Sequence, residues 1–253
     1  MATSSETHLD GSGAGRAKAL LLAGGLGTRL RPLTNTVPKC LVPIAGKPLV
    51  DYWFDSLERA GVSDVLINTH HLRDAVRTHL DAVAKVRPLR LGETYEPVLL
   101  GSAGTVHANR AYADDADEIL IIYADNLSSV DLGEVLAFHR SHSDPMTMLL
   151  FRTPYPKQCG IAELDENGRI VEFTEKPEQP KSDLANAGLY VLDADAYREV
   201  ADRNVFDFGF DVLPTFVGRM RGFLFSGYHR DVGNHEALAQ AEVDAPRVFG
   251  SEA

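Results

Sequence analysis

The chain has 253 residues, of which 44% are hydrophobic and 24% charged, a composition typical of a globular protein with one large core. Its formal net charge of −11 excludes general affinity for nucleic acid, which needs a basic surface, so any anion site must be local. Two cysteines, Cys40 and Cys159, form neither a disulfide framework nor a metal quartet, which predicts a reducing, cytoplasmic setting.

The first 16 residues are rich in Ser, Gly and Thr and contain no apolar segment. They predict a flexible tail (1–16) rather than a signal peptide. Residues 17–253 follow as a single domain, without a Pro-rich linker or an internal repeat. No run approaches the length needed to span a bilayer, so no membrane partner is predicted.

The first predicted element is a buried strand at residues 19–22, and a glycine-rich loop follows it directly. The loop reads Leu22-Ala23-Gly24-Gly25-Leu26-Gly27-Thr28-Arg29-Leu30, and Lys39 comes ten residues after Arg29. Clustered glycines let backbone N–H groups converge on an anion, because no side chain projects from their Cα atoms. An ordinary tight turn would also use glycines, but the basic residues that follow favour a polyphosphate site.

Two better-known phosphate loops do not fit this sequence. The dinucleotide fingerprint needs a third glycine where Leu30 stands. The P-loop needs a lysine and then Ser or Thr after its last glycine, whereas Gly46-Lys47 is followed by Pro48. The loop therefore belongs to another class of phosphate site.

After this loop, the spacing of apolar residues predicts helices and strands in alternation. An amphipathic helix is predicted from Pro48 to Gly61, then a strand at 65–67, a second helix at 72–83 and strands at 89–91 and 119–122. Strands that alternate with helices indicate βαβ units and a mostly parallel sheet.

The second half is richer in strands. Asn167-Gly168 lies between the apolar stretches 161–164 and 170–173, which is the strongest short signal for a hairpin. A further strand is predicted at 184–192 and a helix at 210–217 around Pro214. We therefore expect an α/β fold with a Rossmann-like mixed, mostly parallel sheet flanked by helices, and a β-richer half that covers the acceptor.

Asp125 is the last residue of the predicted strand that begins at Ile119. Ligands of such sheets sit at the carboxyl ends of the strands, where a carboxylate can hold a hard cation beside a triphosphate. A helix N-cap or a turn aspartate is the alternative interpretation.

Together these motifs resemble the sugar-1-phosphate nucleotidyltransferase family, whose opening reads roughly L-A-G-G-x-G-T-R-L-x-P-L-T…P-K-P-L-x-P-I. The resemblance runs from about residue 17 to about residue 242. It is closest in appearance to bacterial mannose-1-phosphate and D-glycero-D-manno-heptose-1-phosphate guanylyltransferases. It implies a nucleotide-diphospho-sugar transferase fold and a reaction in which a sugar 1-phosphate attacks the α-phosphorus of a nucleoside triphosphate. Such a phosphate monoester is largely dianionic at neutral pH, so no general base is needed.

The resemblance also implies site residues, each matched to a family motif. Arg29 and Lys39 are the expected catalytic cations, and Asp125 and Asp231 the expected ligands of Mg²⁺. The expected nucleotide-binding residues are Leu22, Ala23, Gly24, Gly25, Gly27, Thr28, Glu93, Gly101, Ser102, Ala103 and Gly104. The expected sugar-phosphate-binding residues are Asn126, Gly160, Glu175, Lys176 and Asn186.

Two departures from the family pattern bear on the expected site. Cys40 replaces the proline after Lys39, which could displace that lysine. Ala124 replaces the glycine of the family's N-G-D, which would add a methyl group near the nucleotide's ribose.

Two protein-kinase signatures also occur, His229-Arg230-Asp231 and Asp207-Phe208-Gly209. A kinase carries them in the opposite order and adds a glycine-rich hairpin followed by V-A-I-K. We therefore interpret the two tripeptides as a coincidence.

The base is expected to be read along residues 93–105. Guanine presents two adjacent donors, which an acceptor-only carboxylate such as Glu93 can take, so GTP is the predicted donor and a mannose- or heptose-like 1-phosphate the predicted acceptor. A uridylyl- or thymidylyltransferase acting on a hexose 1-phosphate is one alternative. A non-catalytic regulatory subunit that binds nucleotide sugars is another. The sequence leaves open the sugar, its anomer and whether the protein forms a homo-oligomer.

Overall fold

The computed structural model describes residues 16–250, so the tail predicted at 1–16 lies outside the described residues except for Arg16. Within this part of the chain, nine strands form one mixed sheet. The strands are β1 (Ala17–Leu22), β4 (Asp64–Thr69), β5 (Arg90–Tyr95), β6 (Glu118–Tyr123), β8 (Met146–Arg152), β9 (Gly160–Leu164), β10 (Ile170–Glu175), β11 (Leu184–Asp193) and β12 (Met220–Phe225).

The two halves of the sheet differ in strand direction. The first half runs β6-β1-β4-β5, all parallel, as the alternation of strands and helices predicted. In the second half β11 is antiparallel to β6 and to β8, and β9 and β10 form the predicted antiparallel hairpin. The expected α/β fold with a β-richer second half is confirmed.

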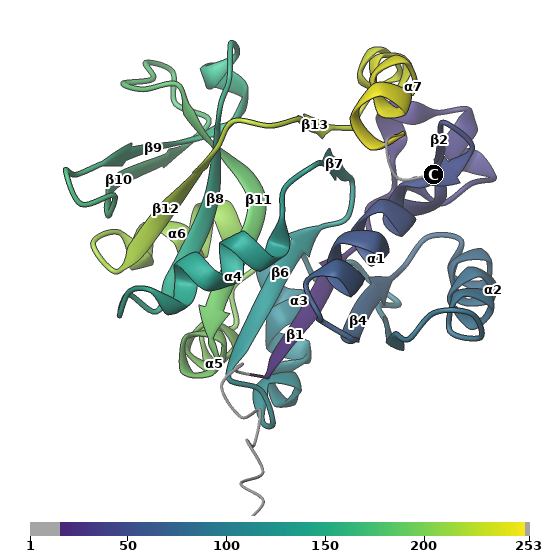
Figure 1. Cartoon of the computed structure of the whole chain (residues 1–253), viewed down its shortest axis with the longest axis horizontal. Coiled ribbons are helices and arrows are strands. Elements are labelled where there is room, and N and C mark those ends of the chain that lie inside the picture. Colours follow the sequence, from purple (N-terminus) through teal and green to yellow (C-terminus); the bar gives the residue numbers. More distant parts are fainter. Residues whose placement is uncertain (1–15, 251–253) are drawn as a thin grey trace, which may run out of the picture.

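Helices cover both faces of this sheet (Figure 1). They are α1 (Leu49–Arg59), α2 (Arg73–Val83), α3 (Ser102–Ala108), α4 (Leu132–Arg140), α5 (Ala194–Asp202), the short α6 (Leu213–Phe216) and α7 (His235–Phe249). Apolar side chains of α1, α2 and α4 pack with Leu21 and Ile67 on one face. Those of α3, α5 and α6 pack with Leu20 and Ile121 on the other, because successive strand residues point to opposite faces.

The structure corrects some of the expected boundaries. The strand before Asp125 ends at Tyr123, so Asp125 lies in the turn that follows it. The helix expected at 210–217 begins two residues earlier, as a π-helix at Phe208–Val212 that continues directly into α6. The strands β8 and β12 were not predicted, because short apolar runs carry no clear period of 2 or 3.6 residues.

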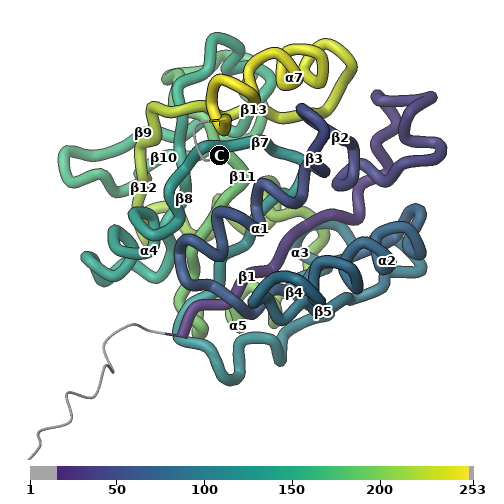
Figure 2. Tube along the Cα trace, turned by 45° about the vertical axis from the view of Figure 1, so that its right-hand side comes forward, coloured from purple at the N-terminus to yellow at the C-terminus, as the bar shows by residue number. Residues whose placement is uncertain are grey.

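In Figure 1 the carboxyl ends of β1 and β6 lie on the side of the sheet where α7 is found, and Figure 2 also shows α7 above β1. There the short strands β7 (Asn126–Ser128) and β13 (His229–Asp231) pair antiparallel and place Asp231 opposite Asn126. This pairing joins the first half of the chain to its last fifty residues. Among the described residues no helix is both long and apolar enough to cross a membrane.

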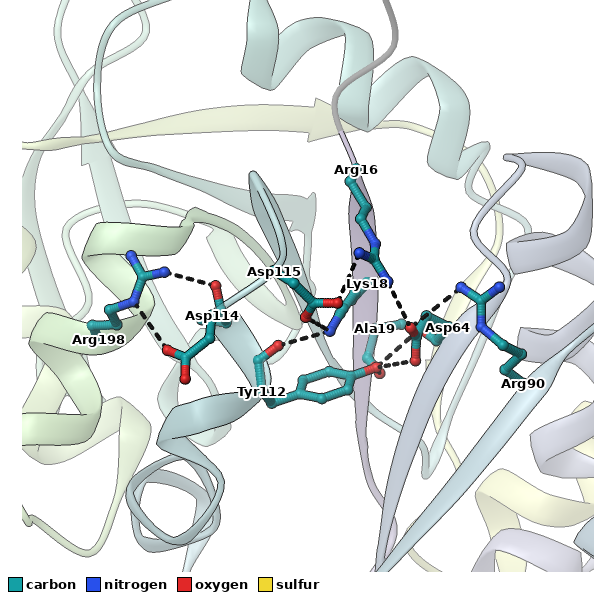
Figure 3. A network of polar contacts seen from close by, with 10 residues as sticks. Arg16, Lys18, Ala19, Asp64, Arg90, Tyr112, Asp114, Asp115 and Arg198 are labelled. Atoms are coloured by element: carbon teal, nitrogen blue, oxygen red, sulfur yellow. Dashed lines mark hydrogen bonds and ion pairs between the residues drawn. The ribbon is translucent and has the colours of Figure 1, made fainter.

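A polar network ties the strands together near the start of β1, β4 and β5 (Figure 3). The buried Lys18 ammonium binds Asp115 and the Tyr112 carbonyl. The Tyr112 hydroxyl lies 3.1 Å from the carbonyl oxygen of Ala19 on β1 and 3.0 Å from that of Asp64 on β4. One phenol therefore bridges two parallel strands.

We expect Tyr112→Phe to lower the free energy of unfolding by about 1 kcal/mol, because one largely buried hydrogen bond is lost. For a chain of this size that corresponds to a fall in Tm of roughly 2–4 °C. Tyr155→Phe is the matched control, since Tyr155 is 65% exposed. Equal Tm values for the two variants would contradict a bridging role for Tyr112.

Candidate active site

Two adjoining cavities open where β7 and β13 meet the carboxyl ends of β1 and β6. The smaller, of about 300 Å³, contains Asp125, Glu175 and Asn186 in its wall. The larger, of about 770 Å³, contains Arg29 and Arg230. The two share the wall residues Phe151, Gln158, Cys159, Lys176, His229 and Asp231. They form one cleft that contains most of the expected catalytic and acceptor residues.

Lys39 lies between the two expected metal carboxylates. Its Nζ is 2.5 Å from Asp125 Oδ2 and 3.9 Å from Asp231 Oδ1. Only 8% of the Lys39 side chain is exposed, although a loop lysine was expected. Cys40, buried beside it, has its thiol pKa raised to about 12 by burial. Although a cysteine stands here in place of the family's proline, Lys39 still reaches Asp125.

The turn that carries Asp125 is fixed from two sides. The Asp125 carbonyl accepts a hydrogen bond of 3.0 Å from Val232 N–H, which ties it to the residue after Asp231. The next carbonyl, that of Asn126, accepts one of 2.8 Å from the indole N–H of Trp53 on α1. Ala124 is fully buried in the core, so its methyl group does not enter the cleft as expected.

Arg29, at the end of the glycine loop, lies near Asp231. A Cβ atom at Gly233 would lie 2.6 Å from Arg29 Nη2 and 2.9 Å from Asp231 Oδ1. Glycine at position 233 therefore lets the guanidinium approach Asp231 closely. Burial and the nearby Asp125 carboxylate raise the pKa of Asp231, while Lys39, Arg29 and Lys176 lower it.

The glycine loop is held by Asn68, a residue that sequence analysis missed. Asn68 Oδ1 accepts from Ala23 N–H at 2.5 Å and from Gly24 N–H at 3.0 Å. These two donors are used inside the protein, so neither is free to bind an anion in this structure. The space where a Cβ at Gly25 would project is open, with no atom within 4 Å. The sequence did contain one indication of this role, because Asn68 is a polar residue directly after the apolar run 65–67.

Asn68 is fixed in turn by a buried carboxylate. Its Nδ2 donates to Glu96 Oε1 at 3.0 Å, and Thr105 Oγ1 donates to the same oxygen at 2.5 Å. The other oxygen of Glu96 accepts from Leu100 N–H at 3.1 Å. Glu96 thus joins the glycine loop to the segment expected to read the base.

Glu93 lies on β5 with both carboxylate oxygens engaged. Arg73 donates to them at 2.7 and 3.2 Å, and Thr69 Oγ1 donates at 2.6 Å. The hydrogen bonds from Arg73 hold the pKa of Glu93 below its usual range. Glu93 is therefore not an open acceptor in this structure, and contact with a base would require it to leave Arg73.

The segment Gly101–Gly104 packs against a later loop. A Cβ at Gly101 would lie 2.3 Å from the Phe206 carbonyl oxygen, and Gly101 has a φ of 78°, so only glycine fits. Ala103 N–H donates to that carbonyl at 3.0 Å. Ser102 Oγ accepts from Phe208 N–H at 2.8 Å, so this hydroxyl is held by the protein itself.

All four acceptor residues expected beyond Asn126 line the smaller cavity: Gly160, Glu175, Lys176 and Asn186. Burial raises the pKa of Glu175, opposed by Lys176. A Cβ at Gly160 would lie only 2.5 Å from Glu175 Oε2, which explains glycine there. Asn126 also lines the cavity, but its Nδ2 donates to the Ala187 carbonyl at 3.0 Å and so supports β11.

His229 forms part of both cavity walls, although sequence analysis gave it no role. Its ring stacks obliquely on Phe151, with 4.6 Å between the ring centroids. Burial lowers the pKa of His229 to about 4, so the imidazole is neutral at physiological pH.

The residues present fit a magnesium ion completed by substrate. Within residues 16–250 no group of three or more His, Cys, Asp or Glu side chains converges on one point. Asp125 and Asp231 can coordinate a cation only through carboxylate oxygens. A carboxylate oxygen of each lies within 4 Å of Lys39 Nζ, so the two carboxylates lie close together. Two carboxylates with water and phosphate oxygens suit Mg²⁺, which retains waters and seldom takes an all-protein shell.

Comparison with known proteins agrees with this arrangement. The family described as "Nucleotidyl transferase" matches residues 18–247. The chain is 31% identical to a mannose-1-phosphate guanylyltransferase of Mycobacterium tuberculosis over 90% of its own length and 64% of the relative's. It is 34% identical to a glucose-1-phosphate thymidylyltransferase of Streptomyces griseus (92% and 68%) and 30% identical to a glucose-1-phosphate adenylyltransferase of Clostridium acetobutylicum (89% and 66%). The chain thus spans about two thirds of the length of these relatives.

A solved structure has the same fold. It is a Bacillus anthracis protein provisionally assigned as a glucose-1-phosphate thymidylyltransferase, in complex with a sucrose. The match has a TM-score of 0.80 and covers 90% of this chain and 95% of the other, at 24% identity.

Proposed function

This chain belongs to the nucleotidyl transferase family, and from this premise we propose that it transfers a nucleotidyl group from a nucleoside triphosphate to a sugar 1-phosphate. One observation carries the proposal. The Lys39 ammonium lies between Asp125 and Asp231 at the cavity whose wall includes Glu175 and Asn186. The expected phosphate site would therefore adjoin a polar pocket of about 300 Å³, in which a sugar could bind.

In the proposed reaction an oxygen of the acceptor phosphate forms a bond to the α-phosphorus. The bond from that phosphorus to the bridging oxygen breaks, and pyrophosphate leaves with the electron pair. Such transfers depend on positioning and on charge stabilisation rather than on a general base. Arg29 would bind the β- and γ-phosphates, and Lys39 would bridge the α-phosphate and the acceptor. Lys176, whose side chain reaches both cavities, would hold the acceptor phosphate.

Asp125 and Asp231 would hold Mg²⁺ beside Lys39. When bound, the ion would neutralise charge on the phosphate oxygens and orient them. With Lys39 and Arg29, the site would then carry enough positive charge to bring two polyanions together.

We further propose GTP as the donor and a mannose- or heptose-like 1-phosphate as the acceptor. The similarity to the mycobacterial guanylyltransferase supports this assignment. The similarities to thymidylyl- and adenylyltransferases support other donors and a glucose 1-phosphate acceptor. The base would lie along residues 93–105, beyond the open side of the glycine loop.

The decisive experiment is a matrix of GTP, UTP, dTTP and ATP against mannose, glucose and heptose 1-phosphates, with pyrophosphate release as the readout. We expect the highest kcat/KM with GTP. A preference for another triphosphate would overturn the guanylyl assignment but leave nucleotidyl transfer standing. Binding without pyrophosphate release in every combination would favour the regulatory alternative.

The role of Glu93 can be tested within the same matrix. If Glu93 leaves Arg73 and accepts from guanine, Glu93→Gln should lower kcat/KM with GTP by roughly 5- to 150-fold, because a donor would then face guanine's own donors. The exposed Glu172→Gln is the control. An unchanged donor ranking with a lower Tm would show that Glu93 serves only to hold Arg73.

A further inference from the structure

The short segment 68–71, around the end of β4, holds the glycine loop at both ends. At the start of the loop, Asn68 Oδ1 accepts from two backbone N–H groups. Toward its end, His71 Nε2 lies 3.0 Å from the Thr34 carbonyl oxygen, and Thr34 Oγ1 donates to the Gly27 carbonyl at 2.7 Å. A Cβ at Gly27 would lie only 2.8 Å from Thr34 Cγ2, so the loop packs closely on Thr34. The loop is therefore fixed by side chains rather than by its own sequence alone.

The same segment also holds the residues expected to lie beside the base. Glu96 N–H donates to the Thr69 carbonyl at 2.8 Å, and His70 Nδ1 lies 2.7 Å from the Glu96 carbonyl oxygen. The Glu96 side chain accepts at 3.0 Å from Asn68 Nδ2 and at 3.1 Å from Leu100 N–H. Glu96 is 2% exposed and Asn68 is 5% exposed, so this connection is buried.

The chemistry of Glu96 determines which way the Asn68 amide points. An amide has one end that accepts hydrogen bonds and one that donates them, whereas a carboxylate only accepts. Glu96 therefore takes the donor end of Asn68, and the acceptor end is left for the glycine loop. If the amide turned over, its NH₂ would face the N–H groups of the loop and its oxygen would face Glu96. Buried polar groups without partners are costly, so the carboxylate selects one orientation.

We propose that Asn68 and Glu96 are positioning residues of the donor site, which hold the glycine loop and the base-side segment as one preorganised unit for the triphosphate. The proposal rests on the proposed function and assigns both residues to donor binding. Neither of them lines the smaller or the larger cavity of the cleft. A preorganised loop binds more tightly because it loses less freedom on binding. Loosening the unit should therefore weaken triphosphate binding and leave acceptor binding unchanged.

The pair allows an experiment in which the acid and the amide change places. Asn68→Asp alone keeps an oxygen for the loop but sets a second carboxylate against Glu96. In Asn68→Asp/Glu96→Gln, the amide at position 96 again donates to the side chain at position 68. Its oxygen still accepts from Leu100 N–H, and the Thr105 hydroxyl can donate instead to the Gly101 carbonyl, which lies 3.0 Å away. The double variant therefore keeps both hydrogen bonds to the glycine loop.

We expect Asn68→Asp to raise the dissociation constant of the triphosphate about 10- to 100-fold, measured by calorimetry with Mg²⁺ and without acceptor. The ligand is the one that the wild type binds most tightly among GTP, UTP, dTTP and ATP. The double variant should recover most of this loss. The KM of the triphosphate should follow the dissociation constant, while the KM of the sugar 1-phosphate stays unchanged at saturating triphosphate. A general weakening of the fold would not separate the two substrates in this way.

Asn167→Asp is the matched control. Asn167 is exposed in the turn between β9 and β10, so the substitution adds the same charge away from the donor site. It should leave the affinity for the triphosphate unchanged.

Equal triphosphate affinity of the wild type and Asn68→Asp would overturn the proposal and leave nucleotidyl transfer intact. A double variant that binds no better than Asn68→Asp would overturn the role assigned to Glu96. If Asn68→Asp does not fold, Glu96→Gln alone gives the comparison, and an unchanged dissociation constant would again overturn the proposal. Triphosphate binding without turnover would instead contradict the proposed function, and the affinities would still decide the role of the pair. Absence of triphosphate binding by the wild type would overturn both.

Discussion

Replacing Lys39 by alanine is expected to lower kcat by at least about 10²- to 10³-fold, the usual cost of removing one group that stabilises transition-state charge. The structure adds a second reason. Lys39 Nζ lies within 4 Å of both Asp125 and Asp231, so its loss leaves two carboxylates facing an incoming triphosphate. The measurement is pyrophosphate release at saturating substrates, together with circular dichroism to show that the fold is retained.

Lys181→Ala is the control for this variant. Lys181 is exposed and paired with Glu172 on the protein surface, away from the residues of the cleft. Its activity should equal that of the wild type. Near-normal activity of Lys39→Ala would mean that Lys39 only separates the two aspartates in the unliganded protein.

The double variant Asp125→Asn/Asp231→Asn is expected to lose activity by about 10²-fold or more, because an amide offers Mg²⁺ neither charge nor a second oxygen. It should also lose a property that does not depend on turnover. A ligand that binds only the folded protein stabilises it by about 2.7 kcal/mol at a concentration of 100 Kd. Mg²⁺ with a triphosphate should therefore raise the Tm of the wild type more than that of the variant.

Asp202→Asn serves as the matched aspartate change, since Asp202 pairs with Arg110 on the exposed outer side of α5. It should retain both activity and the metal-dependent rise in Tm. A full Mg²⁺ response in the double variant would show that the ion is held elsewhere. Single variants would then identify which carboxylate contributes more.

The parts of the fold with a clear period could be predicted from the sequence. The alternation that gave α1, α2 and the parallel strands β1, β4 and β6 depends only on neighbouring residues. The strand β8 could not be predicted, because its apolar run Met146–Leu150 fits a buried helix as well as a strand. Its partners, β11 and β12, lie more than thirty residues away in the chain.

In the candidate site, too, some residues could be predicted from the sequence and others could not. Arg29 and the glycines form one continuous motif, so their proximity could be predicted. Asn68 reaches the site through hydrogen bonds to Ala23 and Gly24, which lie 45 and 44 residues away in the chain, so no local pattern records them. Glu93 shows the reverse case. A carboxylate near the expected base pocket suggested a ligand contact, but Arg73, the first residue of α2, binds it.

Trp53 gives this protein a built-in optical probe. It is the single tryptophan of the sequence, it is 2% exposed, and its indole N–H bonds the carbonyl next to Asp125. All tryptophan fluorescence therefore originates beside the turn that is expected to hold the metal. A change in that hydrogen bond when Mg²⁺ or a triphosphate binds would alter the emission without any label, so each step of site assembly can be followed in stopped-flow experiments on the wild-type chain.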